Sequence, residues 1–591
     1  MAVFERRKED RIATDDSKPL VCTITGTENT DGHVEYILEV WRIPDVENKW
    51  NVSHRYSDFA QLHAVLKVGV TALPTLPPKK VFGNTDRDFI NERRVALQKY
   101  LEGLLSNSLL ASSLLVRQFL DPKNYSRNFQ EEGRQNVHLV LRVGGSHEVT
   151  EALPHCGTRI TKVFFLAHPL ADPKTQHILW WAPFGPDRAM NLRDTHATLT
   201  ALIQCQHPYI VPSVSSVATE AGVCVVRPLF PQGSVRDMIH QARPKGSAVF
   251  KYSGDKVVSI DEKKCAVYGR QILEALLFLH EKGLGHGHVH TGNMVIENNV
   301  CRLLDLENQV VGLPNQLRGQ VIYHRRINSI EALDVYGFGH ALYEMLFQRR
   351  LEADTCEDFP PECSPMPRSV LESILSGEAC KNGLPTVAGL LTHPFFNQVP
   401  LHSYEKPTLK LPSGVKQAVA LSHQTLLTRL AADQKKVRQQ RKMSKAEAFV
   451  SQRSNRPRPK KHLHLETNGL ASVGDSLTNS GNAESLSNSQ PGGAPRAPTS
   501  SPIASFPDTP SSPTSPLPPP PPPPTTPISP VPPPPPPALF PPPAIAGAPA
   551  ATSTEVPAVD AERTALLSSI TAFKKGRLKS VETKDSSKPV I

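Results

Sequence analysis

The sequence predicts a multidomain α+β protein with two folded regions followed by a long tail. Its 591 residues exceed the roughly 250–300 residues that one hydrophobic core supports. Within residues 14–400, patterns typical of strands are twice followed by patterns typical of helices, as in an α+β domain. Many of the 57 prolines lie beyond residue 500, where we expect disorder.

Charge and cysteine content indicate which partners and which cellular compartment are expected. Residues 401–591 hold 23 Lys and Arg against 12 Asp and Glu, whereas residues 1–400 hold 43 against 44. The basic tail favours an acidic partner such as a membrane surface, actin or nucleic acid. The nine cysteines are scattered without metal-ligand spacing, which predicts free thiols in a reducing compartment and no metal site.

The apolar segments of the sequence indicate where in the cell the protein is expected. The first residues contain no secretory signal, and no run of about 18 apolar residues occurs. We therefore expect a cytoplasmic protein whose contact with membranes is peripheral.

The first folded region is predicted over residues 14–125. Residues 19–52 alternate apolar and polar around Gly, Asn and Asp, which indicates a three-stranded antiparallel meander. Helical spacing follows over 57–69 and 86–119. We expect the second of these segments to bury a stripe made of Phe89, Val95, Leu97, Leu101 and Leu105.

Three cationic segments of this region are candidates for binding one phosphorylated ligand. Arg55 and Tyr56 end the third strand, Lys79 and Lys80 close a proline-rich loop, and Arg93 lies on the next helix. Arginine clamps a phosphate with two hydrogen bonds, and lysine supplies a point charge. The alternative is that these residues are solvated charges on an interaction domain.

The order R-Y-S-D-F, L-P-x-L-P-P-K and R-x-x-x-L-x-x-Y-L resembles a PX (phox homology) domain. The resemblance implies binding of a phosphoinositide, most typically phosphatidylinositol 3-phosphate. It implies that Arg55 holds the 3-phosphate and Tyr56 the inositol ring. Lys79 would then meet the 1-phosphate, and Arg93 the 4- and 5-hydroxyls.

The second folded region is predicted over residues 133–400. Short strands are expected at 138–143, 162–167, 177–182 and 223–230, with one helix before residue 207. Strongly periodic helices are expected over 263–282 and 331–347. A small sheet followed by a helical bulk predicts two lobes.

Residues 286–308 resemble the centre of a protein kinase in which the catalytic pattern is altered. Asn293 and Asp305 stand where the pattern has its two magnesium ligands, and His288 replaces the catalytic aspartate. In this alignment Trp181 replaces the phosphate-binding lysine. The alternating histidines around His288 are more typical of structural side chains than of a metal site.

The altered pattern predicts a pseudokinase that needs no cofactor. The glycine cradle, the lysine, its glutamate partner and the catalytic carboxylate are all missing, and phosphoryl transfer depends on such positioning groups. Asn293 and Asp305 leave weak nucleotide or magnesium binding open. The alternative is a divergent, active serine/threonine kinase.

The tail divides into three predicted segments. Residues 401–450 form a basic helical extension, with a long helix over 415–446. Residues 451–555 are a disordered Ser- and Pro-rich linker with unbroken prolines at 518–524 and 532–537. Polyproline fits profilin, SH3 or WW domains, or it is an inert spacer.

Residues 556–585 contain a short amphipathic helix followed by an extended basic segment. This arrangement resembles a WASP-homology-2 motif, which implies binding to monomeric actin. The residues implied in contact are Leu566, Leu567, Ile570, Phe573, Leu578 and Lys579. The alternative is a helix that lies on a membrane surface.

Together the four features resemble the PX domain-containing protein kinase-like family. That resemblance implies endosomal trafficking and modulation of the sodium/potassium pump, with pump subunits as partners. We therefore predict a non-catalytic scaffold, peripheral on endosomal or plasma membrane, with no nucleic-acid partner.

Overall fold

The computed structural model describes most of the first 454 residues. The described ranges are 15–30, 33–79, 86–154, 156–242, 248–254, 256–401 and 406–454. The predicted actin-contacting residues, the polyproline runs and Lys80 therefore lie outside the described residues. None of the described helices is both long and apolar enough to span a membrane.

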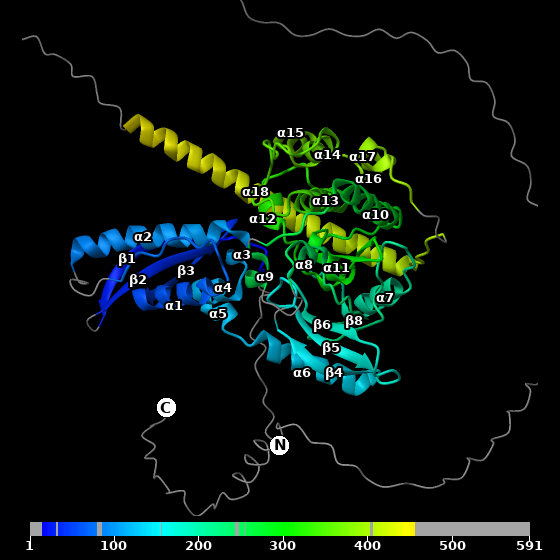
Figure 1. Ribbon diagram of the computed structural model, residues 1–591. Coiled ribbons are helices and arrows are strands. Elements are labelled where there is room, and N and C mark those ends of the chain that lie inside the picture. Colours follow the sequence, from blue (N-terminus) through cyan, green and yellow to red (C-terminus); the bar gives the residue numbers. More distant parts are fainter. Residues whose placement is uncertain are drawn as a thin grey trace, which may run out of the picture. The chain divides into compact units, whose positions relative to one another are not determined.

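The first region contains the predicted three-stranded antiparallel meander (Figure 1). Its strands are β1 (Leu20–Thr30), β2 (His33–Arg42) and β3 (Asp45–Arg55), and β2 lies in the centre. The helices α1 (Tyr56–Lys67) and α2 (Arg87–Ser106) pack against this sheet. The meander and the first predicted helix are thus confirmed.

The predicted second helix is divided into shorter pieces. After α2 the chain forms α3 (Ser108–Ala111), α4 (Leu114–Leu120) and α5 (Pro122–Tyr125). Asn107 ends α2 because its side chain caps α3, accepting from the backbone of Leu109 and Leu110. The expected stripe is partly wrong, since Val95 is 51% exposed while Tyr100 and Leu104 are buried.

The second region begins with a helix where a strand was expected. Residues 138–143 belong to α6 (Phe129–Gly144) rather than to a strand, so that prediction is wrong. Gly133, Val137 and Val140 are buried at helical spacing, whereas Val143 is 92% exposed. Packing against the sheet thus overrides the apolar run that indicated a strand.

Five antiparallel strands follow in the spatial order β4-β5-β6-β8-β7. Their bounds are β4 (His147–Leu153), β5 (Val163–Pro169), β6 (His177–Pro183), β7 (Ser215–Ala218) and β8 (Gly222–Pro228). One face of the sheet packs on α6. The other face joins the large core of the helices, including α7 (Leu192–Ile203). The predicted small sheet ahead of the helical bulk is confirmed, apart from its first strand.

The helical lobe is built on the two strongly periodic helices. These are α10 (Glu262–Glu281) and α13 (Ile330–Phe347), as predicted. The smaller elements are α8 (Val235–Ile239), α9 (Ala248–Tyr252), η1 (Thr291–Asn293), β9 (Met294–Glu297), β10 (Val300–Leu303), α11 (Glu307–Val311), α12 (Arg318–Val321), α14 (Pro365–Leu375), α15 (Gly377–Asn382), α16 (Val387–Leu391) and α17 (Pro394–Asn397).

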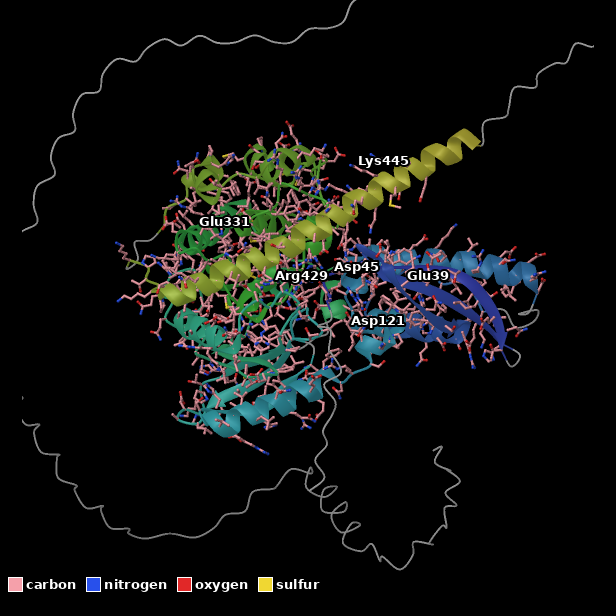
Figure 2. All side chains as sticks on the ribbon, turned by 180° about the vertical axis from the view of Figure 1, so that it is seen from behind. Glu39, Asp45, Asp121, Glu331, Arg429 and Lys445 are labelled. Atoms are coloured by element: carbon pink, nitrogen blue, oxygen red, sulfur yellow. The ribbon has the colours of Figure 1, made fainter. Side chains whose placement is uncertain are left out.

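The predicted long helix is confirmed as α18 (Ser413–Ser454). Val419, Leu426, Leu430 and Val437 are buried at successive intervals of seven, four and seven residues, so they form one stripe on the core of the helical lobe. Figure 2 shows Arg429 near the middle of this helix and Lys445 toward its far end.

Candidate functional site

The junction of β3 and α1 positions the first cationic residue. The Arg55 backbone N–H donates to Asp58 Oδ2 at 2.9 Å, which caps the start of α1. The Arg55 side chain is 52% exposed, and its Nε lies 3.4 Å from Glu35 Oε1. An exposed guanidinium with one weak partner can still receive an anion.

Arg93 lies beneath this junction, between two aromatic rings. Its guanidinium carbon is 4.5 Å from the Tyr56 ring centre and 4.2 Å from that of Phe89. Arg93 is buried, and its Nε and Nη2 have no hydrogen-bond partner among the described residues. Buried donors of this kind are costly unless a ligand receives them.

The proline-rich loop contacts Tyr56, at the start of α1. The Tyr56 hydroxyl donates to the carbonyl oxygen of Pro77 at 2.5 Å. Lys79 follows two residues later with an exposed side chain. The structure therefore brings Arg55, Tyr56 and Arg93 together, with Lys79 on the adjoining loop.

A second candidate site is the cleft between the five-stranded sheet and the helical lobe. Its cavity volume is about 90 Å³. Asn293 and Asp305 line it, and the Asp305 backbone has a φ of 64°, a left-handed conformation that Asp tolerates. Lys162 Nζ lies 2.7 Å from Asp305 Oδ2 and 2.9 Å from Asn308 Oδ1.

The predicted position of Trp181 is wrong. Side chains alternate along β6, so Trp181 packs with Leu179 on the α6 face of the sheet, away from the cleft. Trp180 faces the other way, and Lys162 Nζ is 3.8 Å from its ring centre. A lysine is therefore present in the cleft, supplied by the residue just before β5.

Buried charges in the cleft stabilise one another. Burial alone would raise the pKa of Asp305, but Arg227 and Lys162 outweigh it and hold that pKa well below its ordinary value. Burial lowers the pKa of Lys162 to about 8, against the opposing effect of Asp305. The pair is thus ionised at neutral pH, with Oδ2 of Asp305 bonded to Lys162 and Oδ1 without a hydrogen-bond partner among the described residues.

His288 is a poor candidate for a proton acceptor. It is 3% exposed, and Arg159 Nη2 lies 3.2 Å from its Nδ1. Burial, followed by the nearby charge of Arg159, lowers the pKa of His288 well below its ordinary value. Its Nδ1 lone pair faces a cation, so the imidazole is held neutral and weakly basic.

Hydrogen bonds nevertheless fix the backbone of the loop that carries His288. Asp334 on α13 accepts from the backbone N–H groups of His286 at 2.8 Å and Gly287 at 2.6 Å. Asn293 Nδ2 donates to the carbonyl oxygen of His288 at 3.0 Å. The amide nitrogen of Asn293 therefore closes its own loop.

Sequence reasoning missed Lys162, Arg159 and Arg227. Arg227 Nη1 lies 3.7 Å from Asp305 Oδ1. Nothing in a single strand or loop marks these residues as partners, and no motif spacing includes them. Among the described residues, no group of His, Cys, Asp and Glu is arranged to hold a metal ion.

Family models match three segments of the chain. A PX domain model matches residues 43–123, a protein tyrosine and serine/threonine kinase model matches 187–318, and a WH2 motif model matches 559–588. The matches bear out the two folded regions and the C-terminal motif that the sequence predicted.

Known proteins resemble either most of the chain or less than half of it. The PX domain-containing protein kinase-like protein of Mus musculus is 40% identical over 449 residues, which are 76% of this chain and 77% of that protein. The Slowpoke-binding protein of Drosophila melanogaster is 33% identical over 35% of this chain and 42% of its own length. The probable inactive serine/threonine-protein kinase slob2 of Dictyostelium discoideum is 31% identical over 45% and 49%.

Proposed function

We propose, from the premise that this chain belongs to the family of PX domain-containing protein kinase-like proteins, that it is a non-catalytic scaffold recruited to membranes. Its PX domain would bind a phosphoinositide, its kinase-like domain would bind protein partners, and its C-terminal motif would bind actin. The three functions lie on one chain, so membrane attachment would bring the other two to the same surface.

The arginine pocket supports the lipid function. Arg55 presents an exposed guanidinium, and Nε and Nη2 of the buried Arg93 have no hydrogen-bond partner among the described residues. Phosphate and hydroxyl oxygens of an inositol headgroup would supply the missing acceptors. We propose phosphatidylinositol 3-phosphate as the ligand, with Lys79 and Lys80 as further contacts and endosomal or plasma membrane as the location.

The observation that carries the non-catalytic assignment is His288, which stands in place of the catalytic aspartate and whose Nδ1 lies 3.2 Å from Nη2 of Arg159. A phosphoryl-transfer site uses its carboxylate to hold magnesium on the nucleotide. Here Asp305 contacts Lys162 directly, Asn293 closes its own loop, and His288 is a weak base.

We expect the purified full-length chain to transfer no phosphate from ATP above background, because His288, in place of the catalytic aspartate, is buried and weakly basic. Incubation with radiolabelled ATP, magnesium and a basic acceptor protein measures this. Asp305→Asn is the matched control, since it keeps the size of the side chain and removes its charge.

The alternative, a divergent serine/threonine kinase, is favoured by one observation: the cleft still brings a lysine and a carboxylate together. Phosphate incorporation in the native chain that disappears in Asp305→Asn would support that alternative. It would contradict the scaffold assignment.

The match of residues 559–588 to a WH2 model supports actin as the tail partner. We expect a peptide of residues 555–591 to bind labelled monomeric actin, and Leu566→Ala/Ile570→Ala to bind at least about tenfold more weakly, because two buried apolar side chains are truncated. Fluorescence titration measures both. The contacts proposed besides these two are Leu567, Phe573, Leu578 and Lys579.

Val590→Ala, which lies beyond the matched motif, is the control and should bind like the native peptide. Equal binding by the native and double-variant peptides would contradict the proposed helix face. Capture by acidic vesicles without actin binding would favour a membrane-surface helix instead.

The proposed partners of the kinase-like domain are membrane proteins. One relative is named for binding Slowpoke, and it matches only part of this chain, so we extend the idea to this domain as a proposal. Pump subunits are a second proposal, from the family resemblance. The proline runs would recruit profilin, SH3 or WW domains.

A further inference from the structure

The short helix α9 contacts both the PX domain and the kinase-like cleft. It has five residues, Ala248–Tyr252, and belongs to no motif found in the sequence. In Figure 1 it lies between α3 and α8. Val249 and Phe250 contact the PX domain, whereas Lys251 and Tyr252 contact the cleft, so neighbouring side chains on one turn have different partners.

The contacts with the PX domain are apolar and close. Val249 is 5% exposed and belongs to the PX core. The Phe250 ring rests on Gly69, where an added Cβ would lie 2.4 Å from the ring. Just after the helix, the Thr71 hydroxyl donates to the carbonyl oxygen of Ser253 at 2.8 Å.

The contacts with the cleft are ionic and buried. Lys251 Nζ and the Tyr252 hydroxyl lie 2.9 Å and 2.8 Å from Asp237 Oδ1. The side chains of Lys251 and Asp237 are 4% and 8% exposed. Asp237 and Tyr252 line the cleft, so α9 forms part of its wall.

We propose that α9 is a clip through which the PX domain limits access to the kinase-like cleft. The PX domain holds one side of the clip, and Asp237 holds the other. Weakening the PX side releases α9 and opens the wall of the cleft at Asp237. Such local opening needs less free energy than unfolding of either domain.

The segment that holds α9 also adjoins the arginine pocket. Gly69 and Thr71 follow α1, and the same loop continues to Pro77 and Lys79. A headgroup bound at Arg55 attracts Lys79 and draws this loop away from Ser253. This step rests on the proposed lipid function, and it makes the phosphoinositide the signal that releases the clip.

Cys156 provides a direct measure of opening. It lines the cleft, is partly buried, and its thiol pKa is raised by burial, with Lys251 as the largest opposing influence. Release of α9 exposes this thiol, and the rate of alkylation follows exposure. We would measure N-ethylmaleimide labelling of the full-length chain by peptide mass spectrometry. Buried Cys224 reports any global unfolding.

We expect Thr71→Val/Phe250→Ala to label Cys156 about tenfold faster than the native chain, since one hydrogen bond and one apolar contact are lost. Lys251→Met, on the cleft side, should also speed labelling once the rate is corrected for the thiol pKa, which Lys251 holds down. Val257→Ala, at a 43% exposed position beyond α9, should leave the rate unchanged. An unchanged rate in the PX-side variant would overturn the proposal, whether or not Lys251→Met speeds labelling.

A soluble dibutanoyl phosphatidylinositol 3-phosphate tests the ligand step. We expect it to speed labelling of Cys156 in the native chain and to have no effect on Arg55→Ala, with binding followed by calorimetry on the same samples. Binding without faster labelling would overturn release by the headgroup. Absence of binding would overturn the proposed lipid function, while the variants would still test the clip.

Discussion

Arg55→Ala is expected to weaken binding of the full-length chain to vesicles containing phosphatidylinositol 3-phosphate by about 100-fold or more. Arg55 is exposed, and the contact of its guanidinium among the described residues is a long one to Glu35, so its guanidinium is available to a phosphate. Two charge-assisted hydrogen bonds to one phosphate account for a loss of this size. Vesicle co-sedimentation over a range of lipid concentrations measures it.

The matched control is Lys99→Ala, which removes one positive charge from an exposed position on α2. It should bind within about twofold of the native chain, because an exposed charge outside the pocket adds little. Equal loss in both variants would show that net charge, and not the pocket, drives binding. Equally strong binding to neutral vesicles would contradict the phosphoinositide assignment.

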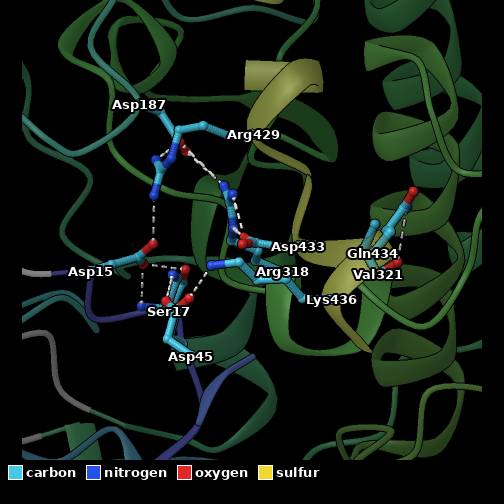
Figure 3. A network of polar contacts seen from close by, with 11 residues as sticks. Asp15, Ser17, Asp45, Asp187, Arg318, Val321, Arg429, Asp433, Gln434 and Lys436 are labelled. Atoms are coloured by element: carbon cyan, nitrogen blue, oxygen red, sulfur yellow. Dashed lines mark hydrogen bonds and ion pairs between the residues drawn. The ribbon is translucent and has the colours of Figure 1, made fainter. Parts of the chain in front are cut away.

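Arg318→Met is expected to lower the free energy of unfolding by about 3–5 kcal/mol, the cost of breaking a buried charge pair. Arg318 lies 3.2 Å from Asp187 and 2.8 Å from Asp433, and its side chain is 4% exposed. Arg429 on α18 also pairs with Asp187, and with Asp15 at 3.2 Å (Figure 3). The variant leaves two buried carboxylates short of a partner. Urea unfolding followed by tryptophan fluorescence measures the loss.

The destabilisation should depend on pH. Burial raises the pKa of Asp187 even though Arg318 and Arg429 oppose it, and loss of Arg318 raises that pKa further. The folded variant then binds more protons than the unfolded chain, so its stability recovers as the pH falls from 7 toward about 5. Arg325→Met, at an exposed position, should change stability by less than about 0.5 kcal/mol. A loss that does not vary with pH would contradict this explanation.

Local pattern accounts for the elements that could be predicted. The meander over residues 19–52 and the helices α10, α13 and α18 follow from periodicity and from breaker residues within each segment. The segment at 138–143 was misassigned because an apolar run is compatible with a strand and with a buried helix. Only its packing on the sheet distinguishes the two.

In the candidate sites, too, prediction reaches only the residues that a local motif contains. The positions of Arg55, Tyr56 and Arg93 in their motifs predict that they lie together. In the structure the Arg93 guanidinium carbon is 4.5 Å from the ring centre of Tyr56, the residue after Arg55. Trp181 was aligned with a lysine, but a shift of one residue along β6 changes the face of the sheet. The lysine of the cleft, Lys162, lies elsewhere in the chain.

By itself, the sequence determined the order of the domains, the candidate cationic residues, the replacement of the catalytic aspartate by His288 and the C-terminal motif. These depend on residue type and on spacing within a short segment. Only the tertiary structure decided that Lys162 pairs with Asp305, which are 143 residues apart, and that α9 links the PX domain to the cleft. Such contacts form between surfaces brought together by folding, and no periodicity within either segment records its partner.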